Sequence, residues 1–267
     1  MKRVYDMNKA ELIDVLGKFC GRRDIPNLTQ KSLQDVYGMK KADVFVLFGG
    51  SILEGGNVLA EAIKAQIAET YIIVGGAGHT TETLREIVGK IFDGIDTKDL
   101  TEAEIFNRYI KEMYGLQADY LECNSTNCGN NITFLLELMK MNHIKCDSII
   151  LAQDASMQCR MAATLKKYVS DEVLIINYAT YQVTVIQKDD DLIYQEQPLG
   201  MWDIDRYITL LMGEIPRLSD DKNGYGPRGK NFISHVDIPQ DVKYAFEELK
   251  RRFPESIREA NPRFASK

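Results

Sequence analysis

A repeated pattern of short apolar runs that end in glycine or polar residues constrains the fold of this chain more than any other feature. The first run is DVFVLFGGS at residues 43–51, and the second is YIIVGG at residues 71–76. An apolar run of this length bounded by glycine is typical of a strand buried on both faces. Helical spacing of apolar residues follows each run, so each pair resembles the opening of a βαβ unit.

Three further strands are expected along the chain, at residues 120–123, 148–153 and 172–179. Helices predicted at residues 101–114 and 132–141 alternate with them. Strands that alternate with helices indicate a mainly parallel sheet covered on both faces. The expected fold class is therefore α/β, a Rossmann-like three-layer sandwich with a mainly parallel sheet and helical additions at both ends.

The pattern predicts three parts in the chain. Residues 1–42 form a helical N-terminal arm that packs against the sheet, residues 43–182 form the Rossmann-like core, and residues 183–267 form a C-terminal extension or cap on the core. In the extension, an acidic KDDD turn indicates a hairpin. Pro239 is a favourable first-turn residue for the last helix.

Composition excludes several classes of protein. With 267 residues, of which 45% are hydrophobic and 27% charged, the chain is typical of a globular protein. The net charge of -6 argues against a broad nucleic-acid-binding surface. No run reaches the length of a membrane span, and the first residues lack the apolar core of a signal peptide. A cytoplasmic protein without nucleic-acid or membrane partners is expected.

The cysteines and histidines indicate neither a disulfide framework nor a metal site. There are five cysteines, none in a CxxC pair, and three histidines. A long chain with this odd number of dispersed cysteines is not expected to depend on disulfides. So few histidines make a His-rich metal site improbable, and no metal is predicted.

Small and polar residues follow four successive predicted strands, where a parallel sheet of this kind binds its ligand. This coincidence is the main internal argument for a site. The predicted catalytic residues are His79 and Asp154. The predicted ligand-binding residues are Gly49, Gly50, Ser51, Gly75, Gly76, Glu122, Ser125, Thr126, Asn127, Asn131, Gln153, Arg160, Tyr225 and Arg228.

The glycines after the first two strands have two interpretations. They can let an anionic group approach a helix N-terminus, or they can serve only a tight turn. The sequence GGSILEGGN is not a GxGxxG fingerprint, and no P-loop lysine follows it. The pattern therefore does not predict classical dinucleotide binding.

Individual polar residues also have competing interpretations. His79 lies in a glycine-rich loop and suits a general base or donor, although a lone histidine is more often structural. Glu122 suits ribose hydroxyls or an amine. Arg160 is the expected anion ligand, with a surface salt bridge as the alternative. Tyr225 and Arg228 belong to a Gly- and Pro-rich loop that either covers the ligand or clasps the last helix.

Four segments, STNCGNN, LAQDASMQCRMAATLKK, GMWDIDRYITLLMGEIPRL and NGYGPRG, resemble the YdcF-like family of uncharacterised bacterial proteins. This family shares a domain of unknown function with SanA and ElyC. The resemblance runs from about residue 43 to residue 239, and the segment around Tyr225 and Arg228 is specific to the YdcF-like branch. It implies a Rossmann-like fold of the kind used by nucleotide-binding enzymes, but no settled reaction.

The chain departs from the wider family in two ways. It has no N-terminal membrane segment of the SanA type, so an envelope role does not carry over. Met157 stands where the wider family often has a histidine, three positions before Arg160. The resemblance therefore does not imply a mechanism that needs a base at that position.

The sequence favours a small nucleotide-like ligand as partner, bound at the carboxyl edge of the sheet. S-adenosylmethionine is the first candidate cofactor, with group transfer as the accompanying chemistry. The alternatives are a non-catalytic ligand sensor and a hydrolase of a phosphorylated or sugar-linked metabolite. The sequence leaves the oligomeric state open.

Overall fold

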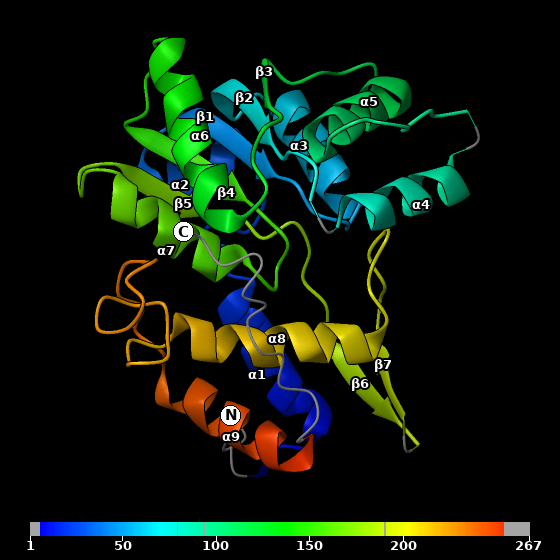
Figure 1. The fold of residues 1–267 in the computed structure, drawn as a ribbon, viewed down its shortest axis with the longest axis vertical. Helices are drawn as coiled ribbons and strands as arrows, with labels where there is room; N and C mark the ends of the chain where they lie inside the picture. The colour runs from blue at the N-terminus through cyan, green and yellow to red at the C-terminus, as the bar shows by residue number, and fades with distance from the viewer. Residues whose placement is uncertain (1–5, 79, 93, 190, 254–267) are drawn as a thin grey trace.

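A five-stranded parallel sheet forms the centre of the protein in the computed structural model, which describes residues 6–78, 80–92, 94–189 and 191–253 (Figure 1). The strands are β1 (Ala42–Phe48), β2 (Ala68–Val74), β3 (Tyr120–Glu122), β4 (Ser148–Ala152) and β5 (Leu174–Asn177). They lie in the order β3-β2-β1-β4-β5. The chain thus proceeds outward from β1 to β3 and then crosses to the other side of β1, which places a topological switch point between β1 and β4.

Helices cover both faces of this sheet. They are α2 (Gln30–Tyr37), α3 (Glu54–Ala65), α4 (Thr81–Ile91), α5 (Glu102–Tyr114), α6 (Cys128–Met141) and α7 (Gln158–Tyr168). Alternate residues of β1 point to opposite faces: Phe45 and Leu47 pack with α2 to α5, and Val44 and Val46 pack with α6 and α7. The expected α/β sandwich is confirmed, and we call this part the sheet unit.

Some boundaries differ from those expected. The helix after β1 ends at Ala65 because Gln66 adopts a left-handed conformation with φ of 51°, and β2 begins at Ala68, three residues earlier than predicted. Ala68 is buried and pairs with Ala42 of β1. Helix α6 begins at Cys128, four residues before the predicted start, because the side chain of Asn127 accepts hydrogen bonds from the backbone of its first turn.

The remaining elements form a second unit, which we call the helical cap. It comprises α1 (Lys9–Cys20), α8 (Ile204–Leu218), α9 (Gln240–Arg252) and an antiparallel hairpin of β6 (Val185–Lys188) and β7 (Asp191–Tyr194). Figure 1 shows these elements together below the sheet. The hairpin and the start of α9 after Pro239 agree with the sequence pattern.

The N-terminal segment is divided between the two units. Leu12 and Leu16 of α1 belong to the apolar core of the cap, with Leu211 of α8 and Leu249 of α9. Helix α2 instead packs on the sheet through Leu33. The sequence predicts that the whole arm packs against the sheet, but helix α1 does not share the core of the sheet.

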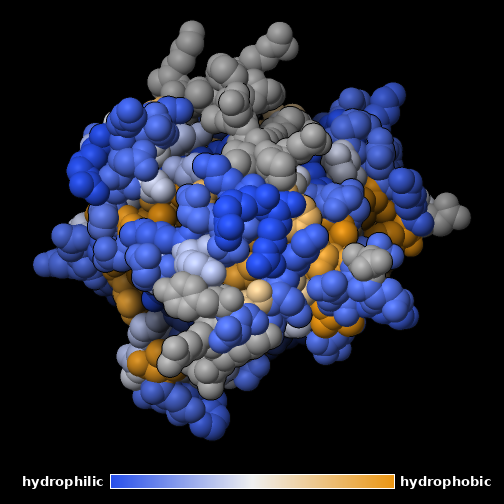
Figure 2. All heavy atoms as spheres, turned by 90° about the horizontal axis from the view of Figure 1, so that it is seen from below, coloured by the Kyte–Doolittle hydropathy of each residue, from blue (hydrophilic) through white to orange (hydrophobic). Residues whose placement is uncertain are grey.

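Hydrophilic residues dominate the surface on the cap side, with separate hydrophobic areas between them (Figure 2). Across the described parts of the chain, no helix combines the length and apolar character needed to cross a membrane.

Candidate functional site

A cavity lies at the carboxyl edge of the sheet, between the loops that follow the strands and helix α8 of the cap. Its volume is about 120 Å³, below the range of roughly 300–1,000 Å³ typical of ligand sites, so a nucleotide-sized ligand requires the cavity to widen. The loops after β1 and β4 contribute to it, so it lies at the switch point of the sheet.

Most of the residues predicted from the sequence line this cavity. They are Gly49, Gly50, Ser51, Gly75, Gly76, Ser125, Thr126, Asn127, Asn131, Gln153 and Asp154. Of the other predicted residues, Glu122, Arg160, Tyr225 and Arg228 do not line it. His79 lies outside the described residues, so its role stays a prediction.

The glycines around the cavity differ in what they permit. A Cβ on Gly49 would lie 2.6 Å from the Glu102 carboxylate, and one on Gly76 would lie 2.1 Å from the Ser125 carbonyl oxygen. Close packing of the protein therefore accounts for these two glycines. A Cβ on Gly50 would meet nothing nearer than the Gln153 amide oxygen at 3.9 Å. Packing does not require glycine at Gly50, which leaves approach of a ligand to the backbone as a reason for it.

Two buried carboxyl groups border the cavity. Glu102, the first residue of α5, accepts hydrogen bonds from the hydroxyls of Thr80 at 2.6 Å and Thr81 at 3.1 Å. Burial raises the pKa of Glu102 above its ordinary value, although these two hydrogen bonds oppose the rise. The sequence does not single out Glu102. The segment TEAE indicates a capping box at the start of a helix, and no local pattern places Glu102 beside the strand ends.

Asp154 is the second buried carboxyl. It accepts hydrogen bonds from the Ser156 hydroxyl at 2.6 Å and from the Tyr181 hydroxyl at 2.8 Å. Burial raises the pKa of Asp154, and the hydrogen bonds from Ser156 and Tyr181 act in the opposite direction. A carboxyl group held in this way can donate or accept a proton as its surroundings change, which suits either binding or acid–base chemistry.

Ser51 is buried at the end of the first loop, with only 1% of its surface exposed. Its Oγ has no hydrogen-bond partner among the described residues. Buried hydroxyls in folded proteins are normally paired, so an unpaired one beside a cavity indicates a place for a polar ligand atom.

The cap contributes the large side chains of the site. The cavity is lined by Arg206 and Leu210 of α8 and by Trp202, which lies two residues before this helix. The Arg206 guanidinium lies 5.4 Å from the centre of the Trp202 ring. It forms no ion pair with any described residue. The sequence analysis does not predict these residues. A signal for them exists: the only Trp of the chain lies four residues before an Arg on an amphipathic helix.

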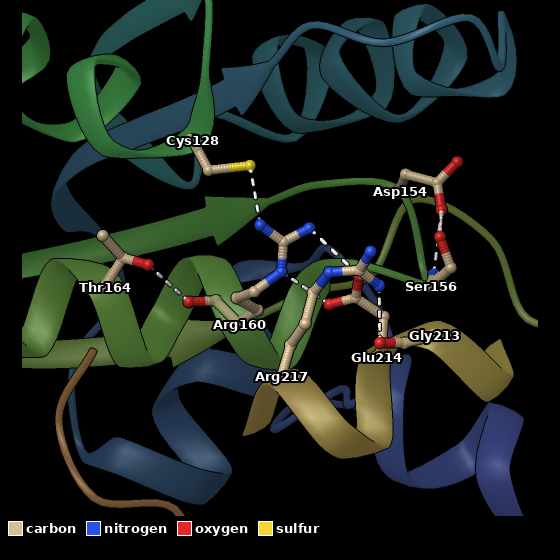
Figure 3. Close-up of polar contacts among 8 residues, drawn as sticks. All are labelled: Cys128, Asp154, Ser156, Arg160, Thr164, Gly213, Glu214 and Arg217. Carbon is tan, nitrogen blue, oxygen red and sulfur yellow. Dashed lines mark hydrogen bonds and ion pairs between the residues drawn. The ribbon is translucent and has the colours of Figure 1, made fainter. Parts of the chain in front are cut away.

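Arg160 does not line the cavity, and its side chain lies in the contact between the two units. Its guanidinium donates to both carboxylate oxygens of Glu214 on α8, at 2.6 and 3.1 Å, and to the Cys128 sulfur at 3.0 Å (Figure 3). With 13% of the Arg160 side chain and 5% of the Glu214 side chain exposed, this is a largely buried ion pair. It is not the surface salt bridge considered from the sequence.

Three other predicted residues have structural contacts of their own. Glu122 accepts hydrogen bonds from the backbone N–H groups of Asn124 and Ser125, and so shapes the loop after β3. Tyr225 packs edge-on against Phe232, with ring centroids 5.2 Å apart. Arg228 pairs with Asp220 at 3.3 Å.

No described residue of the Gly- and Pro-rich loop lines the cavity. That loop folds on itself and reaches α7, where Ser234 donates a backbone hydrogen bond to the Ala163 carbonyl. This arrangement agrees better with a clasp than with a cover, the two interpretations that the sequence left open.

Within the described ranges, no three His, Cys, Asp or Glu side chains are grouped so as to hold a metal ion. The site therefore offers free backbone at Gly50, two buried carboxyls, an unpaired hydroxyl and an unpaired guanidinium. No family model matches the chain.

Proposed function

We propose that this protein binds a small nucleotide-like ligand in the cavity between the sheet edge and α8, with S-adenosylmethionine as the first candidate. The observation that carries the proposal is the convergence of two unpaired polar groups, Ser51 Oγ and the Arg206 guanidinium, at the switch point of a Rossmann-like sheet. The resemblance to the YdcF-like family supports the same class of ligand.

The chemistry of the cavity suits a ligand that carries both signs of charge. Arg206 can pair with a carboxylate or phosphate of the ligand, and Ser51 can donate to it. Glu102 and Asp154 offer carboxyl oxygens for ribose hydroxyls or an amine. S-adenosylmethionine has a carboxylate, an amine and two ribose hydroxyls, and it supplies an electrophilic methyl group for transfer when bound.

A thermal-shift measurement with the full chain tests the proposal. The probes are S-adenosylmethionine, adenine nucleotides and a sugar phosphate. A ligand at about 100 times its dissociation constant stabilises the folded state by roughly 2.7 kcal/mol. For a chain of this size, each kcal/mol raises the melting temperature by about 2–4 °C. We expect a rise of several degrees with S-adenosylmethionine.

Two variants locate the bound ligand. Gly50→Val places a side chain in open space, and Arg206→Ala removes the unpaired guanidinium. Both should abolish or strongly reduce the shift. Arg108→Ala is the matched control, because Arg108 is half-exposed and pairs with Glu112 on the outside of α5. A shift that survives in both cavity variants, or the absence of a shift with every probe, would contradict the proposal.

A further inference from the structure

Cys128 occupies an unusual position between two hollows of the protein. It is the first residue of α6, a helix of 14 residues, and is half-buried. It lines the cavity described above and also a second hollow between α6, α7 and the loop that carries Tyr225. A small molecule can therefore reach the sulfur without passing through the apolar core.

The Arg160 guanidinium is fixed against this sulfur. Its Nη1 lies 3.0 Å from Cys128 Sγ, while its Nε and Nη2 are held by the Glu214 carboxylate (Figure 3). The positive end of the α6 dipole lies at the same point. Both features place positive charge beside the sulfur, which is the setting of cysteines that react with electrophiles.

The charged groups around Cys128 carry one positive charge in excess. Arg160 and Arg217 share the single carboxylate of Glu214, and the Arg217 Nη1 lies 3.6 Å from Glu214 Oε1. Among the described residues, neither arginine has another ion-pair partner. One positive charge is therefore left over in a group whose side chains are at most 14% exposed. This excess positive charge contacts the Cys128 sulfur through Arg160.

The other four cysteines lie in surroundings that disfavour a thiolate. Burial raises the pKa of Cys146 to about 11 and that of Cys159 to about 12. Burial also raises the pKa of Cys123, and it raises that of Cys20 far above its ordinary value. At neutral pH these four thiols stay protonated and react slowly with electrophiles.

A separate observation marks the cavity beside Cys128 as a place for a small molecule. Ser51 lines the same cavity, and only 1% of its surface is exposed. Its Oγ lacks a hydrogen-bond partner among the described residues. A polar group of an entering molecule would satisfy this hydroxyl within the same space that Cys128 borders.

We propose that Cys128 is a site of covalent modification by small electrophiles that enter this cavity. The sulfur of Cys128 forms a bond to an electrophilic carbon, the bond from that carbon to its leaving group breaks, and the thiol proton passes to water. The inference concerns the reactivity of the thiol and does not depend on which ligand the cavity binds.

Limited alkylation of the full chain with iodoacetamide at neutral pH tests the proposal, with peptide mass spectrometry to locate the label. We expect Cys128 to be carboxamidomethylated first, at a rate about tenfold above that of the same residue in the urea-unfolded chain, because only the folded protein holds the Arg160 guanidinium and the start of α6 against its sulfur. The other four cysteines should react more slowly in the folded protein than in the unfolded chain.

Variants connect this reactivity to its cause. Cys128→Ser should abolish the fast labelling, and Arg160→Gln should slow labelling of Cys128 while Arg108→Gln leaves it unchanged. The comparison of folded and unfolded wild-type chains stands even where Arg160→Gln does not fold. A Cys128 that reacts no faster in the folded protein than in urea, or fast labelling at another cysteine, would overturn the proposal. Failure to bind S-adenosylmethionine would leave this outcome unaffected.

Discussion

The sheet unit and the helical cap contribute to the cavity in different ways. The sheet unit supplies backbone and short side chains, such as Gly50 and Ser51, at the ends of its strands. The cap supplies bulky side chains, Arg206 from α8 and Trp202 from the residues just before it. The sheet therefore fixes where a ligand can lie, and the cap closes the space and adds the one unpaired positive charge found among the described lining residues.

Polar contacts join the two units, and the Arg160–Glu214 pair is a largely buried ion pair among them. Arg160 belongs to α7 of the sheet unit, and Glu214 belongs to α8 of the cap. A second contact runs from Asp154, in the loop after β4, to Tyr181, whose ring lies in the apolar core of the cap. Substitutions at these contacts should change the free energy of unfolding differently from substitutions inside one unit.

Loss of the buried ion pair should give the largest effect on stability. Arg160→Met leaves the Glu214 carboxylate buried with only the more distant Arg217 beside it. We expect a loss of about 3 kcal/mol in the free energy of unfolding, since breaking a buried pair on one side typically costs about 3–5 kcal/mol. Chemical denaturation measures it.

The double variant Arg160→Met with Glu214→Leu is the control for this prediction. It removes both charges of the pair together but leaves Arg217 without an ion-pair partner among the described residues, so only part of the lost stability should return. A single variant as stable as the wild type would contradict the view that this pair joins the two units.

A smaller effect is expected from the sheet unit alone. In Gly76→Ala, the added methyl group would lie 2.1 Å from the Ser125 carbonyl oxygen and would displace the loop after β3. Overpacking of this kind costs about 1–3 kcal/mol. Denaturant unfolding should show the loss, together with a weaker thermal shift from any ligand of the cavity.

Gly89→Ala is the matched substitution. Gly89 lies within α4, and an added Cβ meets no atom within 4 Å. Alanine is the better helix former, so this variant should gain up to roughly 1 kcal/mol. Equal effects of the two substitutions would show that the close packing at Gly76 has no energetic consequence.

The smallest effect concerns the pH dependence of stability. Because burial raises the pKa of Glu102, the folded state binds its proton more tightly than the unfolded state does. The contribution of Glu102 to stability is therefore greatest at low pH and declines as the pH rises from its ordinary pKa of 4.5 through the higher folded value.

Glu102→Gln cannot lose this proton. Relative to the wild type, the variant should become more stable as the pH is raised from 4 to 7, as measured by denaturant unfolding at each pH. A difference between the two proteins that stays constant with pH, or that moves the other way, would exclude a raised pKa at Glu102.

The same contrast explains how far the sequence predicts the structure. Apolar runs and glycines are local signals, so the sequence predicts the five strands and eleven of the residues that line the cavity. Glu102 reaches the cavity only because α5 begins beside Gly49 and Gly75, contacts between segments far apart in the chain.

Local sequence signals do not predict the contacts of the cap. No pattern near Arg206 indicates that α8 crosses the sheet edge. Arg160 follows its strand like the other predicted residues, yet Glu214, 54 positions later, determines where its guanidinium lies. Partners at this distance in the sequence have no signature in a single chain.

Amide hydrogen exchange of the full chain, with and without saturating S-adenosylmethionine, tests most directly whether the two units form one ligand site. We expect added protection both in the loops at residues 49–52 and 75–78 and at residues 202–210 of the cap, with no change in the β6–β7 hairpin. Protection confined to one unit, or to a surface away from both, would contradict a shared site.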